Sequence, residues 1–198
     1  MAKTIEHYYD FSSPNAYFAS MQLPPVAARY GAKIVHRPFF LGGLFKSLDV
    51  AMTPGMTSEN KTRWSLRDFD LWSQKYGIPF RFPQKFPMNT VKPLRAALAI
   101  LDRGEDLHAF AAATFRAYWV DGADISDDAT LGEITRASGY DTDAVMALAQ
   151  EQRIKDALRD ATDGAARRGV FGAPTFFVGD DLVFGKDRLE FLEDLLRA

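Results

Sequence analysis

A serine followed by a proline, Ser13-Pro14, comes directly after a short run of aromatic and β-branched residues. Residues 5–9 suit a buried strand. Ser13 suits the N-cap of a helix and Pro14 its first position. Such a helix directs unpaired N–H groups and the positive end of its dipole at whatever lies above Ser13, which favours an anion. The same residues also fit an ordinary capped helix that binds no ligand.

A second candidate for chemistry is the short segment GAPT, residues 172–175. A cis Ala173–Pro174 bond would turn the N–H and C=O of Ala173 outward, as strand-edge partners for an extended peptide ligand. The alternative is a trans proline that merely opens a strand, and trans bonds are far commoner.

Charged residues near the expected ends of elements could hold a zwitterionic ligand. Lys186 and Asp187 open the last expected helix, where Asp187 suits the N-cap, and Lys46 follows two glycines in a loop from which it could reach a carboxylate. The simpler alternatives are an ordinary helix start and a solvated surface lysine.

Composition excludes several function classes. The 198 residues include no cysteine, which removes disulfides, zinc–cysteine sites and cysteine nucleophiles, so any thiol must come from another molecule. The net charge of −2, without a basic cluster, predicts no nucleic-acid or membrane-surface partner. The three histidines lack metal-ligand spacing, so no metal site is expected. No apolar run has the length of a signal segment or a membrane helix, and we expect a cytoplasmic protein.

The order of predicted elements indicates an α/β fold. Residues 5–9, 14–29 and 33–40 form a β-α-β unit, in which Pro24-Pro25 should kink or interrupt the helix. Residues 41–46 read as a flexible exit. Helical periods follow, and a β-hairpin and a last helix from Asp187 complete the chain. We therefore expect a thioredoxin-like domain, residues 1–40 and 150–198, interrupted by an all-helical insertion domain, residues 41–149.

Three segments resemble the 2-hydroxychromene-2-carboxylate isomerases and the closely related kappa-class glutathione transferases: YDFSSPNAY (9–17), GVFGAPTF (169–176) and FGKDRL (184–189). The resemblance extends over essentially the whole chain. Both groups are similar to disulfide-oxidising thioredoxin-fold enzymes with a helical insertion. Where those enzymes have Cys-Pro-x-Cys, this chain has SPNA (13–16), so dithiol redox chemistry is excluded.

The resemblance implies glutathione as the thiol that the chain itself lacks. Ser13 would hydrogen-bond the sulfur, Ala173 would pair with the cysteinyl backbone, Lys186 and Asp187 would hold the γ-glutamyl end, and Lys46 would reach a carboxylate. The implied site consists of Ser13, Pro14, Asn15, Lys46, Ala173, Pro174, Lys186 and Asp187. The chain departs from the family in Asn15, where an aromatic residue is common, and in the loop after Lys46, which lacks the asparagine of the transferases.

The function that the resemblance implies is a glutathione-dependent cis–trans isomerase in aromatic breakdown. Its substrate would be an aromatic keto acid, to which the thiolate adds reversibly, and a homodimer is expected. Candidate pocket aromatics include Trp64, Phe82 and Phe86. One alternative is a kappa-like glutathione transferase that conjugates electrophiles. The other is a non-catalytic thioredoxin-fold protein that binds peptides at the Ala173-Pro174 edge.

Overall fold

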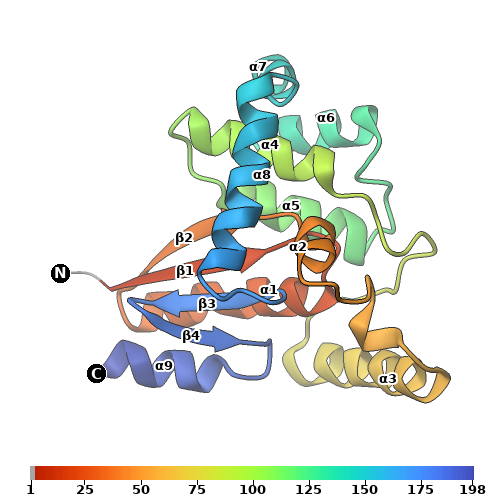
Figure 1. Cartoon of the computed structure of the whole chain (residues 1–198), viewed down its shortest axis with the longest axis vertical. Coiled ribbons are helices and arrows are strands. Elements are labelled where there is room, and N and C mark those ends of the chain that lie inside the picture. Colours follow the sequence, from red (N-terminus) through yellow and green to blue (C-terminus); the bar gives the residue numbers. More distant parts are fainter. Residues whose placement is uncertain (1–2) are drawn as a thin grey trace.

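A mixed sheet of four strands lies at the centre of the thioredoxin-like part of the chain (Figure 1). The computed structural model describes residues 3–198. The strand order is β2-β1-β3-β4, formed by β1 (Thr4–Tyr9), β2 (Lys33–Pro38), β3 (Thr175–Val178) and β4 (Asp181–Phe184). Strand β1 pairs in parallel with β2 and antiparallel with β3, and β3 pairs antiparallel with β4. The β-α-β unit and the hairpin are thus confirmed, although β2 ends at Pro38 rather than at residue 40.

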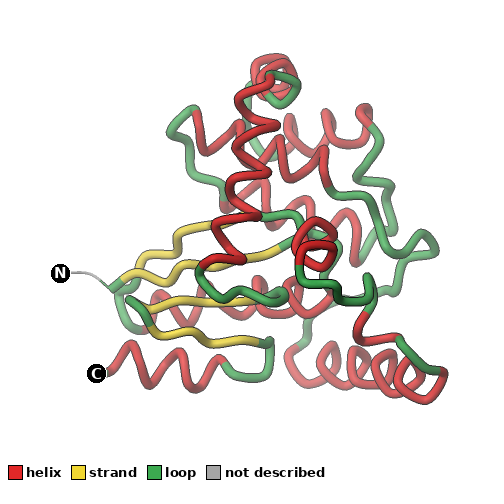
Figure 2. The backbone as a smooth tube through the Cα atoms, viewed as in Figure 1, coloured by secondary structure: helices red, strands yellow, loops and turns green. Residues whose placement is uncertain are grey.

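The segment between β2 and β3 is helical throughout its regular structure (Figure 2). It contains α2 (Leu41–Ser47), the 3₁₀ helix η1 (Pro54–Met56), α3 (Glu59–Tyr76), α4 (Val91–Asp102), α5 (His108–Trp119), α6 (Asp128–Ala137), α7 (Thr142–Leu148) and α8 (Gln152–Arg167). The predicted thioredoxin-like α/β fold with a helical insertion is confirmed. Helix α8 packs on both β2 and α4, and the division at residues 41 and 149 stays a prediction. Within residues 3–198, no helix combines the length and the apolar character needed to cross a membrane.

One expectation about helices is wrong, and a second is wrong in part. Residues 41–46 form helix α2 instead of a flexible exit, because the Asp10 carboxylate accepts the Leu41 N–H at 2.8 Å and thereby caps the helix from another segment. Gly42 suits this helix because an added Cβ would lie 2.8 Å from the Phe40 ring. Helix α1 (Pro14–Arg29) runs without a break through Pro24-Pro25, so these prolines do not interrupt it.

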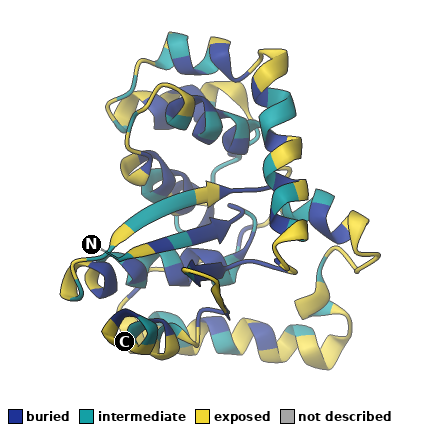
Figure 3. Ribbon diagram, turned by 60° about the vertical axis from the view of Figure 1, so that its left-hand side comes forward, coloured by how far each residue is buried: buried dark blue, intermediate teal, exposed yellow. Residues whose placement is uncertain are grey.

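The buried side chains form two clusters, and Figure 3 shows buried residues along the strands and in the helices around them. The smaller cluster joins the sheet to α1 and α9 (Leu189–Arg197) through Ile5, Phe176 and Leu192. The larger cluster continues from the β1–α1 turn into the insertion, where Trp119 Nε1 donates to the Phe11 carbonyl at 2.8 Å. The insertion therefore shares one apolar interior with the turn that precedes α1.

Two histidines, the buried His7 and the half-buried His36, lie side by side. The ring centroids of His7 and His36 are 6.2 Å apart, and the His7 ring stacks on Phe176 at 5.0 Å. Neither ring nitrogen of His7 has a hydrogen-bond partner in the described part of the chain. Burial, followed by repulsion from His36, lowers the pKa of His7 well below its usual value. Burial, followed by repulsion from His108, lowers the pKa of His36 to about 4.

We predict that these histidines make the fold sensitive to acid. Their folded-state pKa values lie below the unfolded value of about 6.5, so the unfolded chain gains protons first and stability falls as pH drops through 6.5. His7→Phe keeps a flat ring next to Phe176 and should reduce the loss of unfolding free energy between pH 7 and pH 5 by about 2 kcal/mol. Urea unfolding at both pH values measures this. Equal losses in His7→Phe and wild type would contradict the prediction.

Candidate active site

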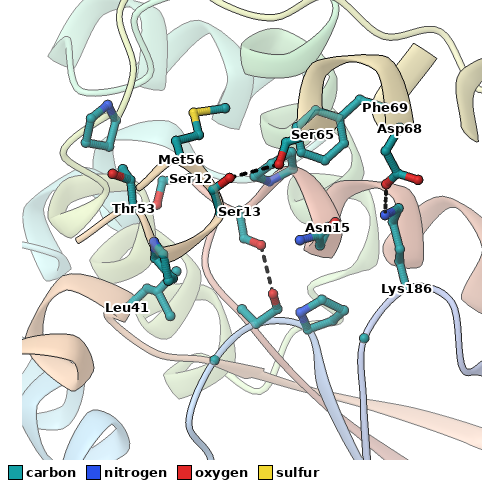
Figure 4. A pocket seen from close by; sticks show the side chains of 18 of the residues that line it. Ser12, Ser13, Asn15, Leu41, Thr53, Met56, Ser65, Asp68, Phe69 and Lys186 are labelled. Carbon is teal, nitrogen blue, oxygen red and sulfur yellow. Dashed lines mark hydrogen bonds and ion pairs between the residues drawn. The ribbon is translucent and has the colours of Figure 1, made fainter. Parts of the chain in front are cut away.

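The N-terminus of α1 lies against a large cleft, which we call the Ser13 cleft (Figure 4). Its volume is about 770 Å³. One wall comes from the thioredoxin-like part: residues 12–15, 171–174 and 184–187. The other comes from the insertion: α2, the segment 50–56 and one face of α3. The cleft is therefore built at the junction of the two parts, where ligand sites commonly occur.

Ser13 is the N-cap of α1, as predicted. Its Oγ accepts the Ala16 N–H at 3.2 Å, and Pro14 occupies the first turn. The Ser13 hydroxyl donates its one proton to the carbonyl of Ala173 at 3.0 Å, and the side chain is buried. Pro14 and Asn15 line the cleft beside it. A ligand anion above Ser13 would meet the N-terminus of a 16-residue helix and compete with Ala173 for this proton.

The Ala173–Pro174 peptide bond is cis, the rarer of the two forms considered from the sequence. Ala173 and Pro174 both line the cleft opposite the start of α1. The Ala173 carbonyl accepts the Ser13 hydroxyl with one lone pair and keeps the other for a ligand. The Thr175 hydroxyl donates to the Gly172 carbonyl at 2.8 Å, which ties the loop back on itself.

Lys186 lies in the cleft and pairs with an acid that sequence reasoning missed. Its side chain is only 9% exposed, and its Nζ lies 2.6 Å from Asp68 Oδ2 of α3 and 4.8 Å from the centroid of the Trp72 ring. Ser65 and Phe69 lie on the same face of α3, and both line the cleft. Asp68 could have been found from the sequence, because it stands three residues after Ser65 on a helix and therefore lies on the same face. The ion pair joins the two walls.

Asp187 lines the cleft but does not cap the last helix. Helix α9 begins at Leu189 with Arg188 in the cap position, so the predicted N-cap at Asp187 is wrong. The Asp187 carboxylate contacts Arg188 at 2.8 Å instead. The preceding Gly185 has φ +108°, and an added Cβ would lie 2.6 Å from Asp187 Oδ1, so a larger residue would displace this carboxylate.

Lys46 does not join the other predicted site residues. It lies on the exposed side of α2 and is absent from the residues that line the cleft. The physical reason is that residues 41–47 form a helix, which packs Leu44 and Phe45 inward and turns Lys46 toward solvent. A contact from Lys46 to a ligand carboxylate in the cleft is therefore not supported.

The mouth of the cleft is apolar. Trp64, Met52 and Phe171 line it and are 64%, 54% and 51% exposed. Of the aromatic candidates named from the sequence, Trp64 and Phe86 line the cleft, whereas Phe82 packs against Phe86 and Trp119 outside the lining. Such a rim offers apolar surface to a flat organic ligand.

The charged side chains that line the cleft are two lysines and two aspartates: Lys61, Asp68, Lys186 and Asp187. No histidine is among the described lining residues, and residues 3–198 contain no group of three or more ligands that could hold a metal ion. The described lining thus lacks a nucleophile–base pair of the hydrolase type. What the cleft provides is a helix N-terminus with a hydroxyl donor, a pair of opposite charges and an apolar rim.

Asp10 positions the turn that carries Ser13. Its buried carboxylate accepts the Ser12 N–H at 2.9 Å, the Leu41 N–H at 2.8 Å and the Thr90 hydroxyl at 2.7 Å. Burial raises the pKa of Asp10, and these hydrogen bonds oppose that rise. One side chain thus joins the β1–α1 turn to the starts of α2 and α4, a role that the sequence did not reveal.

Comparison with known proteins agrees with this geometry. The family model described as "DSBA-like thioredoxin domain" matches residues 4–197. The chain belongs to this family. It is 33% identical to a 2-hydroxychromene-2-carboxylate isomerase of Sphingobium xenophagum, over 99% of each chain. It is 27% identical to glutathione S-transferase kappa 2 of Caenorhabditis elegans, over 98% of this chain and 92% of that one.

A solved structure of a 2-hydroxychromene-2-carboxylate isomerase superposes with a TM-score of 0.82 at 26% identity, covering 98% of this chain and 94% of that one. The resemblance noted from the sequence is thereby confirmed. The chain is an enzyme of the DsbA-like family, and its relatives include isomerases and transferases.

We predict that Asp10→Asn weakens the fold at neutral pH. An amide offers one acceptor oxygen and a donor NH₂ group, so at least one of the three donors around Asp10 loses its partner. The expected loss is about 1–3 kcal/mol of unfolding free energy, measured by urea titration at pH 7. The exposed Asp70→Asn of α3 is the matched control. An Asp10→Asn protein as stable as this control would show that the carboxylate does not hold the three segments together.

Proposed function

We propose that the protein is a glutathione-dependent cis–trans isomerase of the 2-hydroxychromene-2-carboxylate type. The observation that carries the proposal is the Ser13-capped start of α1, which opens into a large cleft in a chain without any cysteine. The isomerase at 33% identity over both whole chains supports the same reaction. The proposed substrate is an aromatic keto acid, whose ring would pack against the apolar rim of Trp64 and Phe171.

The start of α1 suits a thiolate. A thiol with a pKa of about 8.5 is about 3% ionised at pH 7, and lowering its pKa to about 6.5 requires about 2.7 kcal/mol of preferential stabilisation of the anion. The Ser13 hydroxyl and the N–H groups of the first turn can supply this amount together. Ser13 would transfer its hydrogen bond from the Ala173 carbonyl to the sulfur, because a charged acceptor binds a donor more strongly than a neutral one.

The opposite charges of Lys186 and Asp68 suit the zwitterionic γ-glutamyl end of glutathione. The Lys186 ammonium can bind its carboxylate, while Asp68 and Asp187 can accept from its ammonium. Because Lys186 is buried and already oriented by Asp68 and Trp72, little side-chain entropy remains to be lost when a ligand binds. Pro14, Asn15, Ala173 and Pro174 would enclose the cysteinyl part.

When bound, glutathione would supply a nucleophilic sulfur for reversible addition to a conjugated carbon of the keto acid. The protein's contribution is to hold the anion at α1, to anchor the charged end at Lys186 and to exclude water with the apolar rim. No general base is required in this scheme, which agrees with a described lining that contains no histidine.

A kappa-like glutathione transferase is the second candidate, favoured by the kappa-class relative that covers 98% of this chain. It would use the same thiolate site on an electrophile. Product fate separates the two: isomerisation leaves total glutathione unchanged, whereas conjugation depletes it in step with substrate. The non-catalytic peptide-binding alternative loses support because the chain matches isomerases and transferases over nearly its whole length.

Two further expectations stay predictions. A cytoplasmic location would suit the proposed function, since that compartment keeps glutathione largely reduced. A homodimer is expected from the resemblance alone.

We predict that Ser13→Ala slows isomerisation by about 10²-fold, as expected for the loss of one donor to a reacting anion. The ultraviolet absorbance of bound thiolate near pH 7 should fall with it. Ser58→Ala is the matched control, because Ser58 caps α3 through the Lys61 N–H in the same way but lies outside the cleft. Unchanged turnover and unchanged absorbance in Ser13→Ala would remove this hydroxyl from the mechanism.

We predict that Lys186→Met raises the KM for glutathione by about tenfold or more, because a charged hydrogen bond to the γ-glutamyl carboxylate is lost. The dipeptide cysteinylglycine lacks the γ-glutamyl group, so its KM should be similar in Lys186→Met and wild type. Steady-state kinetics with both thiols measure the difference. Equal increases for the two thiols would mean that Lys186 supports the wall of the cleft rather than the γ-glutamyl end.

A further inference from the structure

A second hollow lies beside the edge strand β2, between α4 and α8. Its volume is about 250 Å³, and it shares no lining residue with the Ser13 cleft. We call it the Arg168 hollow and define it by Arg168 and Ala161 of the α8 segment, Arg37 of β2, Tyr8 of β1 and Leu101 of α4. The proposed isomerase chemistry uses none of these residues.

The polar side of the hollow carries an excess of positive charge. Arg37 Nε lies 2.7 Å from Glu6 Oε2, and Arg168 Nη1 lies 2.7 Å from Glu6 Oε1. One carboxylate is thus shared by two guanidinium groups, which leaves one positive charge uncompensated within this cluster. No carboxylate is found among the described residues that line the hollow. The hollow therefore attracts an anion of single charge.

Arg168 is held in place before any ligand arrives. Its Nη1 also donates to the Tyr8 hydroxyl at 2.8 Å, and its guanidinium carbon lies 4.0 Å from the centroid of the Phe177 ring. An arginine has five N–H donors, and Glu6 and Tyr8 use only those of Nη1. Because Tyr8 accepts from Arg168, its own O–H proton remains available as a further donor within the described chain.

Apart from His36, the rest of the lining is apolar. Leu98 and Leu101 of α4 face Ala161 and Ala165 of α8 across the hollow, and Pro38 closes the end of β2. These side chains offer no hydrogen bonds to replace the water molecules around an inorganic ion. They suit a ligand that joins a charged head to a compact apolar body.

We propose that the Arg168 hollow binds a small organic carboxylate. The carboxylate lies against the free edge of the Arg168 guanidinium, with Arg37 and the Tyr8 hydroxyl beside it, and the apolar body packs between α4 and α8. A carboxylate matches the planar fork of arginine with two parallel hydrogen bonds. The single excess charge and the apolar walls favour this class over inorganic phosphate.

The test uses sodium benzoate as the probe, titrated into the isotopically labelled full-length protein and followed by backbone amide NMR. The amide signals of β2 and of residues 161–168 should shift with saturation. Arg168→Gln should weaken the apparent affinity by about tenfold or more. Arg159→Gln, an exposed arginine on the same helix, is the matched control and should bind as wild type does. Benzamide has the same shape without the charge and should produce no saturable shift.

Two further variants keep the proposal testable if Arg168→Gln does not fold. Ala161→Phe fills the hollow without altering its charge, and Arg37→Gln removes the second guanidinium; both should weaken benzoate binding. Shifts confined to the Ser13 cleft, equal binding of benzamide, or full binding by Ala161→Phe would overturn the proposal. Binding of inorganic phosphate without binding of benzoate would overturn it as well, because the apolar walls would then have no role.

Discussion

The buried carboxylate of Asp10 is the interaction on which the site depends. A carboxylate removed from water must be satisfied by hydrogen bonds, and Asp10 receives them from three segments that are far apart in sequence: Ser12, Leu41 and Thr90. Neither Phe40 nor Thr90 caps its own helix with a side-chain hydrogen bond. Asp10 therefore caps α2 in place of Phe40 and takes up the hydroxyl of Thr90. Because the buried carboxylate needs these hydrogen bonds, Asp10 holds the starts of α2 and α4 against the turn before α1.

Other contacts fasten the insertion to the same turn. Trp119 of α5 donates to the Phe11 carbonyl, and the Tyr17 hydroxyl of α1 donates to the Pro79 carbonyl in the segment after α3. These bonds lie within a shared aromatic interior, in which Phe11 packs on Phe115 at 5.0 Å between ring centroids. The two parts of the chain therefore meet as packed surfaces around the first turn of α1. This explains how a cleft with walls from both parts can keep a defined shape.

Sequence reasoning succeeded where the signal was local. Ser13-Pro14 predicts the start of α1, because capping depends on residues within one turn of the helix end. It failed where the partner lies elsewhere in the chain. Helix α2 was missed because its cap is Asp10.

The same limit applies to the site. The Asp68–Lys186 pair could not be predicted, since no periodicity relates residues 118 positions apart. The direction of the Lys46 side chain was predicted wrongly because α2 was not predicted, and the helix determines that direction. Asp187 lines the cleft as predicted, and only its N-cap role was wrong: the close approach of its carboxylate to Gly185 and its contact with Arg188 hold it outside the helix, which begins at Leu189.

Ser13 gives the cleft a preference for anions through a simple count of protons. Its hydroxyl has one proton to donate, and in this structure the neutral carbonyl of Ala173 receives it, while the Ala16 N–H occupies one lone pair. A neutral ligand that accepts from Ser13 would replace the hydrogen bond to Ala173 with one of similar strength, so little free energy would be gained. A thiolate forms a stronger bond with the same proton and also gains from the helix N-terminus. In the proposed function, the Ser13–Ala173 hydrogen bond would hold the hydroxyl in position and would be given up for an anion in preference to a neutral group.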